Sequence, residues 1–281
     1  MTARVLIIAG SDSGGGAGIQ ADIKTVTMLG GHAMTAITAI TAQNTLGVQG
    51  VHAVPTEMVL AQIESVVSDI GVDAVKIGMI GSAATADALV DALAVLDVPV
   101  VFDPVMVATS GSVLADEPTV AAFGRIMDIA WLLTPNLPEL EALGGEEAIL
   151  AHGCALLVKG GHADGDVLTD RLLGDWGEVA RWEDSRIDTL HTHGTGCTLA
   201  SGIATGLAQG LPMADAIARA RAFVRAALLA APGFGSGHGP MGLCCRPSPI
   251  AGDRSALSPS PTASGNGDAM PPAFGLSGEG L

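Results

Sequence analysis

Basic residues are scarce in this sequence. Its 13 lysines and arginines stand against 29 aspartates and glutamates, which gives a net charge of -16. A surface with this balance repels polyanions, so the composition argues against nucleic acid and anionic membranes as partners. Long apolar runs are also missing, since none approaches the roughly 20 residues of a membrane-spanning helix. No secretory pattern of a basic segment, an apolar core and a cleavage site is visible at the start.

Cysteine is sparse as well. The chain has 4 cysteines, and two of them, Cys244 and Cys245, stand next to each other near the C-terminal end. This spacing fits neither a disulfide framework nor a zinc site. We therefore expect a protein of the reducing cytoplasm whose partner is a small molecule.

Hydrophobic residues and glycine, by contrast, are plentiful. The chain of 281 residues is 48% hydrophobic and has 38 glycines, which is enough for one large α/β domain. From residue 244 onward the sequence turns to Pro, Ser, Gly and Ala without helical or strand periodicity. Such a segment cannot bury enough apolar surface to fold. We expect a folded domain over residues 1–243 and a disordered tail over residues 244–281.

Short apolar runs alternate with helical periodicity along the domain. Residues 5–9 are apolar throughout, which is typical of a strand buried on both faces. Further strands are expected at residues 74–79, 98–102, 130–133 and 155–158, with helices at 19–29, 56–70, 82–96, 198–208 and 212–230. Edge strands are expected at 166–173 and 185–190. This alternation predicts a parallel sheet with right-handed crossovers, in which ligands bind at the carboxyl ends of the strands.

Polar side chains follow three of these strands. Asp103 comes directly after one strand, Asn136 and Glu139 follow the next, and Lys159 follows the third. The carboxylates and the amide could hold Mg²⁺ directly or through water, and the lysine could meet phosphate oxygens as a point charge. Asn136 could also cap the helix that follows it, and this role does not exclude a contact with the metal ion.

A glycine-rich turn at residues 193–198 runs directly into an apolar helix. Unpaired N–H groups at the positive end of a helix dipole make a pocket for phosphate, although simple helix capping is the plainer alternative. Cys197 stands in the first helical turn, where we expect the helix N-terminus to lower the pKa of the thiol. A second glycine-rich loop, residues 10–18, is expected to approach a small ligand, with a plain strand-to-helix turn as the alternative. The Gln43 and Asn44 amides suit a nitrogen heterocycle, although a turn that is stabilised by their bonds to the backbone is the plainer alternative.

Seven motifs in this order closely resemble the hydroxymethylpyrimidine and phosphomethylpyrimidine kinases of thiamine biosynthesis, a branch of the ribokinase-like family. They read AGSDSGGGAGIQAD from Ala9, TAQNT from Thr41, KIGM from Lys76, DPVMV from Asp103, TPNLPE from Thr134, VKGGH from Val158 and THGTGCT from Thr192, and they span roughly residues 5–240. The resemblance implies a three-layer α/β/α sandwich with a mostly parallel central sheet. It also implies ATP with Mg²⁺ as phosphoryl donor, and a homodimer.

The resemblance assigns roles to individual residues. It implies that Cys197 is the catalytic base, where most ribokinase-like enzymes have an aspartate. The implied catalytic set is completed by Gly194, Thr195, Gly196 and Lys159. Substrate binding is implied for Gly10, Asp12, Gln43, Met79 and Val107, ATP or phosphate binding for Asn136, Lys159, Gly160 and Thr195, and metal binding for Asp103 and Glu139.

The implied reaction is ATP-dependent phosphorylation of 4-amino-5-hydroxymethyl-2-methylpyrimidine, followed by phosphorylation of its monophosphate. One site could serve both steps, because a phosphate monoester is already ionised and needs no strong base. Three alternatives stay open: a pyridoxal or pyridoxine kinase of the same fold, a vitamin-binding protein without activity, and a hydrolase with Cys197 as nucleophile. The last of these lacks a histidine relay that is evident in the sequence.

Overall fold

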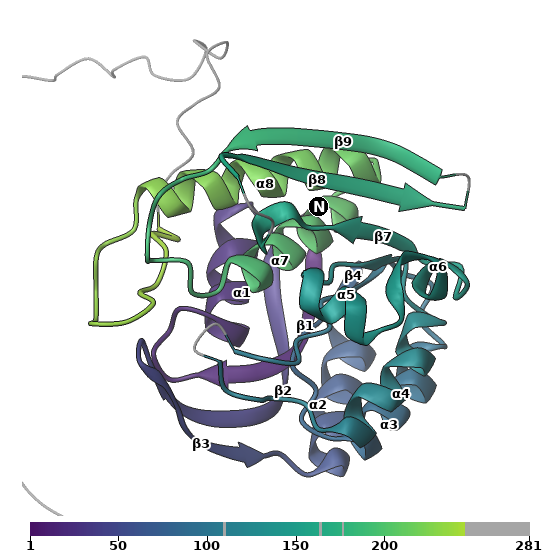
Figure 1. The fold of residues 1–281 in the computed structure, drawn as a ribbon. Coiled ribbons are helices and arrows are strands. Elements are labelled where there is room, and N and C mark those ends of the chain that lie inside the picture. The colour runs from purple at the N-terminus through teal and green to yellow at the C-terminus, as the bar shows by residue number, and fades with distance from the viewer. Residues whose placement is uncertain (109–110, 163–164, 176, 245–281) are drawn as a thin grey trace, which may run out of the picture. The chain divides into compact units, whose positions relative to one another are not determined.

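The computed structural model describes residues 1–108, 111–162, 165–175 and 177–244. Within these residues nine strands form one sheet, in the order β3-β2-β1-β4-β5-β6-β7-β8-β9 (Figure 1). The strands are β1 (Arg4–Asp12), β2 (His32–Asn44), β3 (Gly47–Ala53), β4 (Ala74–Ile77), β5 (Val100–Phe102), β6 (Leu132–Leu133), β7 (Ala155–Val158), β8 (Val167–Gly174) and β9 (Gly177–Ser185). The helices are α1 (Gly18–Met28), α2 (Thr56–Asp69), α3 (Ala83–Leu93), α4 (Glu117–Met127), α5 (Leu137–Ala142), α6 (Gly145–Leu150), α7 (Thr195–Ala208) and α8 (Met213–Leu229), with a 3₁₀ turn, η1, at Gly160–His162.

The middle of the sheet is parallel. β1 pairs in parallel with β2 and β4, and parallel pairing continues from β4 through β5 and β6 to β7. Antiparallel pairs lie at the two edges, β2 with β3, and β8 with both β7 and β9. The expected mostly parallel sheet is confirmed, and it brings the carboxyl ends of the central strands to one edge.

Helices cover both faces of this sheet. Side chains of β1 alternate between the two faces: Leu6 and Ile8 pack with residues of α2, α3 and α4, whereas Val5 and Ile7 pack with residues of α1, α7 and α8. All four side chains are fully buried, as expected for a strand that is covered on both sides. The two helix groups lie on opposite sides of the sheet (Figure 1), so the three-layer architecture is confirmed.

The edges of the sheet depart from the sequence prediction. The strand expected at residues 185–190 is wrong, because the last strand is β9 and it ends at Ser185. β3, which the sequence pattern does not predict, pairs at the opposite edge. Most residues of β3 and β9 are exposed or half-buried. Neither strand therefore shows the alternation of apolar and polar residues by which a strand that faces a core is predicted.

The described residues belong to one compact unit. Apart from Cys244, the tail expected over residues 244–281 lies outside the described residues, so the boundary at residue 243 stays a prediction. None of the helices in the described part of the chain combines the length and the apolar character that crossing a bilayer requires.

Candidate active site

The carboxyl ends of β5, β6 and β7 bring a lysine, a carboxylate and a hydroxyl together. Lys159 Nζ lies 3.2 Å from Asp103 Oδ1, and the Thr134 hydroxyl donates to the same oxygen at 3.0 Å. Burial lowers the pKa of Lys159, but the charges of Asp103 and Glu139 outweigh it and the net shift is upward. The expected meeting of Asp103 and Lys159 at this edge of the sheet is therefore confirmed, and the lysine is charged.

Glu139 lies beside this pair at the start of α5. Asn136 and Glu139 form a capping box: the Asn136 side chain accepts from the Glu139 N–H at 2.9 Å, and the Glu139 carboxylate accepts from the Asn136 N–H at 2.8 Å. The capping role of Asn136 is thus confirmed. Glu139 is 6% exposed, and burial together with the negative charge of Asp103 raises its pKa to about 7.

The two carboxylates fit a magnesium ion that is shared with a nucleotide. Mg²⁺ usually takes one or two protein carboxylates and completes its shell with waters and substrate phosphates. Among the described residues no group of three or more His, Cys, Asp and Glu side chains could hold a metal, so Asp103 and Glu139 would provide the smaller set of one or two carboxylates. The charge of Asp103 already raises the pKa of Glu139, and a cation between the carboxylates would relieve that repulsion.

The N-terminus of α7 opens against the Asp103–Lys159 pair. Its N-cap, Gly194, has φ +85°, and a Cβ there would lie 1.9 Å from the Gly16 carbonyl oxygen, so only glycine fits. No side chain caps the helix, and in the described part of the chain the N–H groups of Gly196 and Cys197 have no hydrogen-bond partner. A Cβ on Gly196 would lie 3.3 Å from Asp103 Oδ2 and 3.6 Å from Lys159 Nζ. Open amides and a lysine thus surround one point, as an anion-binding loop requires, and the Asp103 carboxylate lies beside them.

The Cys197 thiol differs from its prediction. The residue is half-buried, and its burial raises the pKa of the thiol to about 11. Lys76 and a backbone hydrogen bond at Gly18 act in the opposite direction, while Asp22 and Asp103 add to the rise. The expected lowering of the pKa is therefore wrong, because a helix dipole is worth only about 0.3–1 kcal/mol and burial beside two carboxylates outweighs it.

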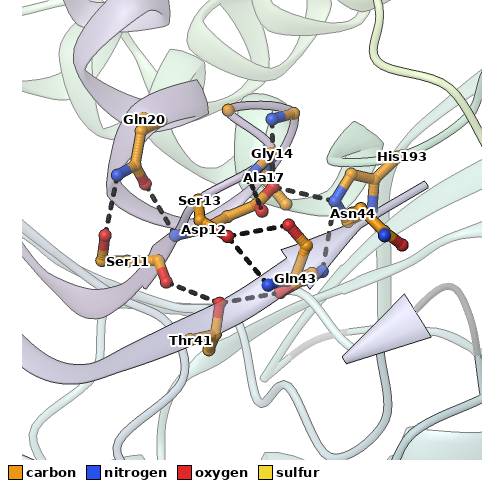
Figure 2. A network of polar contacts seen from close by, with 12 residues as sticks. Ser11, Asp12, Ser13, Gly14, Ala17, Gln20, Thr41, Gln43, Asn44 and His193 are labelled. Carbon is orange, nitrogen blue, oxygen red and sulfur yellow. Dashed lines mark hydrogen bonds and ion pairs between the residues drawn. The ribbon is translucent and has the colours of Figure 1, made fainter. Parts of the chain in front are cut away.

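The glycine-rich loop after β1 is organised by Asp12 (Figure 2). Its carboxylate accepts hydrogen bonds from the backbone N–H groups of Gly14 at 2.8 Å, Gly16 at 3.0 Å and Ala17 at 2.8 Å. Burial raises the pKa of Asp12, but these bonds and the one to His193 outweigh it and the net shift is downward. The ionised carboxylate shapes the loop, and direct contact of Asp12 with substrate stays a prediction.

His193 joins this loop to the strand end that carries Gln43. Its Nε2 lies 2.9 Å from Asp12 Oδ2 and 3.3 Å from the Gln43 side-chain amide (Figure 2). Since Asp12 is ionised, Nε2 carries a proton and donates it to the carboxylate. This proton also decides the orientation of the Gln43 amide, because an N–H of His193 and an N–H of Gln43 would repel each other. The amide oxygen therefore faces His193, and the amide nitrogen faces the Thr41 hydroxyl. His193, the first residue of the anion-binding turn, therefore contacts both Asp12 and Gln43.

The sequence of this chain matches those of known proteins. The sequence model of the family described as phosphomethylpyrimidine kinase matches residues 12–242. The chain belongs to the phosphomethylpyrimidine kinase family. The hydroxymethylpyrimidine/phosphomethylpyrimidine kinase of Streptomyces coelicolor is 47% identical over 214 residues, which cover 71% of this chain and 79% of that protein.

Solved structures related to this member of the family have the same fold. The phosphomethylpyrimidine kinase of Clostridium difficile 630 aligns with a TM-score of 0.70 at 36% identity, covering 80% of this chain and 99% of that one. The pyridoxal kinase of Staphylococcus aureus in complex with pyridoxal aligns with a TM-score of 0.79 at 29% identity, covering 88% of this chain and 96% of that one. Structures of the same pyridoxal kinase are also known with ADP and with AMP-PCP.

The remaining site predictions for this phosphomethylpyrimidine kinase family member fare unevenly. Gly10 and Met79 are neighbours, since a Cβ on Gly10 would lie 3.0 Å from Met79 Sδ. Val107 is 48% exposed and bridges to Val113, so its place in the substrate pocket stays a prediction. The Gly160 N–H donates to Asp170 at 2.8 Å, which leaves Gly160 no free backbone donor for a phosphate.

Sequence reasoning assigned no role to three buried polar residues of this site. Thr134 fixes the orientation of Asp103, and Asp22 and Lys76 form an ion pair at 2.9 Å beneath the first turn of α7. Each stands inside a quoted motif, TPNLPE, GIQAD or KIGM. The lysine within the apolar strand at residues 74–79 could have indicated the ion pair. A charged side chain in a strand that is buried on both faces needs an oppositely charged partner.

Proposed function

We propose that this chain transfers the γ-phosphoryl group of ATP to the hydroxymethyl group of 4-amino-5-hydroxymethyl-2-methylpyrimidine. The same site then phosphorylates the monophosphate to the diphosphate, as a step of thiamine biosynthesis. The observation that carries the proposal is the uncapped N-terminus of α7, whose free Gly196 and Cys197 N–H groups lie beside Asp103 and Lys159. Phosphoryl transfer depends on positioning and on charge stabilisation, and this point of the molecule offers both.

The alcohol step requires a base. The Cys197 thiolate takes the proton of the substrate hydroxyl, the alkoxide oxygen bonds to the γ-phosphorus, and the bond from that phosphorus to the bridging oxygen of ADP breaks. Since the pKa of the thiol is about 11, only a small fraction is thiolate at neutral pH. The rate of this step should therefore rise with pH up to that value.

The nucleotide side is held by Lys159, by the α7 amides and by the two carboxylates. Lys159 can exchange its contact with Asp103 for a phosphate oxygen, and the open N–H groups of Gly196 and Cys197 bind the transferring group. When bound through Asp103 and Glu139, Mg²⁺ supplies charge neutralisation on the phosphates. The cap uses only the oxygen of the Asn136 side chain, and among the described residues its nitrogen has no acceptor, so it can donate to a phosphate.

A product-resolved kinase assay tests the proposal. Purified protein is mixed with ATP and Mg²⁺ and, in separate reactions, with the free alcohol or its monophosphate, and the products are separated by ion-exchange chromatography. In the first reaction we expect one ADP for each monophosphate and two ADP for each diphosphate that accumulates, and in the second reaction one ADP for each diphosphate. Absence of ADP with both acceptors would refute the function and favour a vitamin-binding protein without activity.

A pyridoxal or pyridoxine kinase is the second candidate, and the fold similarity to the S. aureus pyridoxal kinase supports it. Both acceptors carry a hydroxymethyl arm on a nitrogen heterocycle. The two candidates are separated by kcat/KM on hydroxymethylpyrimidine and on pyridoxine. We expect a higher kcat/KM on the pyrimidine. A higher kcat/KM on pyridoxine would make pyridoxine kinase the better-supported function.

A homodimer and a cytoplasmic location belong to the same proposal. Both rest on the resemblance of the motifs and on the composition of the chain, with its net charge of -16 and 4 cysteines. Light scattering on the full chain tests the dimer, and fractionation of cells tests the location. The small-molecule acceptor remains the expected partner.

A further inference from the structure

A fully buried ion pair lies beneath the transfer site and takes no part in the mechanism above. Lys76 on β4 bonds Asp22 on α1 at 2.9 Å, and neither side chain has any exposed surface. The second Asp22 oxygen accepts from the Ser201 hydroxyl on α7 at 2.6 Å. Strand β4 and helices α1 and α7 are thus joined by one polar cluster.

The spacing on the two helices places this cluster next to Cys197. Gly18 and Asp22 are four residues apart on α1, and Cys197 and Ser201 are four residues apart on α7, so each pair shares one helix face. Asp22 bonds Ser201, and the Gly18 backbone acts on the Cys197 thiol in favour of the thiolate. The helices therefore lie in register, and the ion pair sits one turn below the thiol.

The Lys76 ammonium reaches toward the carboxyl edge of the sheet. A Cβ on Gly78, two residues further along, would lie only 2.7 Å from Lys76 Nζ, so the side chain runs beside the backbone that ends β4. Four charged groups act on or beside the thiol: Lys76 from β4, Asp22 from α1, Asp103 after β5 and Lys159 after β7. Of these, Lys76 gives the largest effect in favour of the thiolate.

We propose that Lys76 is a positioning residue for Cys197: held by Asp22 and Ser201, it keeps a permanent positive charge beside the thiol and stabilises the thiolate. This inference rests on the proposed function only where it assigns Cys197 as base. A buried ion pair often adds no stability over an apolar pair of the same size. Its charge therefore has a purpose here other than stability, namely a counter-charge that solvent cannot screen.

Alkylation of Cys197 by iodoacetamide tests this without any kinase reaction. The full chain is treated at pH 8, and modification of each cysteine is followed by peptide mass spectrometry. We expect slower alkylation in Lys76→Met and faster alkylation in Asp22→Asn than in the wild type. Each pKa unit changes the thiolate fraction about ten-fold, and the opposing change in nucleophilicity leaves a rate effect of about three-fold.

The opposite signs separate an electrostatic role from a structural one. If the pair only held the helices together, both variants would loosen the site and both would speed alkylation, which would overturn the proposal. Lys76→Met can fail to fold, so Asp22→Asn is also compared with Lys76→Met/Asp22→Asn, two chains that differ only in the buried ammonium. Slower alkylation of the double variant supports the proposal, and an equal or faster rate refutes it. Lys24→Met, which removes an exposed lysine of α1, should alkylate Cys197 at the wild-type rate.

Because this readout needs neither ATP nor a pyrimidine, it stands even if the proposed activity fails. The kinase assay adds a second readout. If Lys76 acts through Cys197, Lys76→Arg should restore kcat on the alcohol, and Lys76→Met should lower kcat while KM changes little. A loss confined to KM would contradict the assigned role.

Discussion

Two lysine–aspartate pairs lie near the carboxyl edge of one sheet, and they differ in access to solvent. In Lys76–Asp22 both side chains have 0% exposed surface, and the nitrogen and oxygen lie 2.9 Å apart. In Lys159–Asp103 the exposed fractions are 15% and 4%, and the distance is 3.2 Å. The closed pair is joined by Ser201 from α7, whereas the open pair faces the free amides of that helix.

This difference shows how one motif can have two uses. A charge sealed in the core cannot change its partner, so Lys76 acts as a fixed charge. A charge at the border of the core can exchange a carboxylate for a phosphate, so Lys159 can bind a substrate. The variants below break the two pairs separately.

The largest effect is expected on stability when the closed pair is broken. Lys76→Met leaves Asp22 buried without its cation, which should lower the free energy of unfolding by about 3–5 kcal/mol. Urea unfolding measures this. The control is Arg125→Met, which removes an exposed arginine of α4 that pairs with Asp87 of α3. This change should lower the free energy of unfolding by no more than about 1 kcal/mol. Equal losses in the two variants would show that burial of the Lys76–Asp22 pair makes no difference to the cost of breaking it.

Breaking the open pair should instead affect the rate. Lys159→Met removes a cation from the transferring phosphoryl, and we expect kcat to fall about 10²- to 10³-fold, or about 2.7–4 kcal/mol of barrier. Steady-state kinetics on the alcohol measure the rate, and urea unfolding should show a smaller loss than Lys76→Met. A variant that keeps its activity would remove Lys159 from the site.

Glu139, beside the open pair, should make the free energy of unfolding depend on pH. Its pKa in the folded chain is about 7 against an ordinary 4.5, so the folded state holds a proton that the unfolded state has lost. Stability from this group is present at low pH and falls as pH rises from 4.5 to 7, by about 3 kcal/mol in all. Glu139→Gln keeps an acceptor for the cap and should lose this slope in urea unfolding. An unchanged slope would contradict the shift.

The sequence predicts the central parallel sheet because its strands are buried on both faces and read as continuous apolar runs, as residues 5–9 do. It also predicts that Asp103 and Lys159 meet, since the carboxyl ends of parallel strands share one edge. Edge strand β9 escaped prediction because most of its residues are exposed and alternation is weak.

The site was less predictable where several segments meet. Gly160 reads as a phosphate-binding residue from its place after a lysine, yet its N–H is used by Asp170 from the next strand. The pKa of the Cys197 thiol is raised first by burial and then by Asp22 and Asp103, which are distant in sequence. Local motifs indicate which residues face a ligand, whereas the electrostatics of each group depend on the whole fold.

Gly196→Ala tests the central claim most directly, because it adds one methyl group where the phosphoryl must pass. The new Cβ would lie 3.6 Å from Lys159 Nζ, which is an ordinary contact, and 3.3 Å from Asp103 Oδ2, which is a tight contact that the carboxylate relieves by moving a few tenths of an ångström. The measurement is kcat on the alcohol with saturating ATP and Mg²⁺, beside a thermal melt. We predict a loss of about a hundred-fold in kcat, with a Tm that still lies above the assay temperature. A variant with wild-type kcat would show that phosphoryl transfer does not occur at the N-terminus of α7.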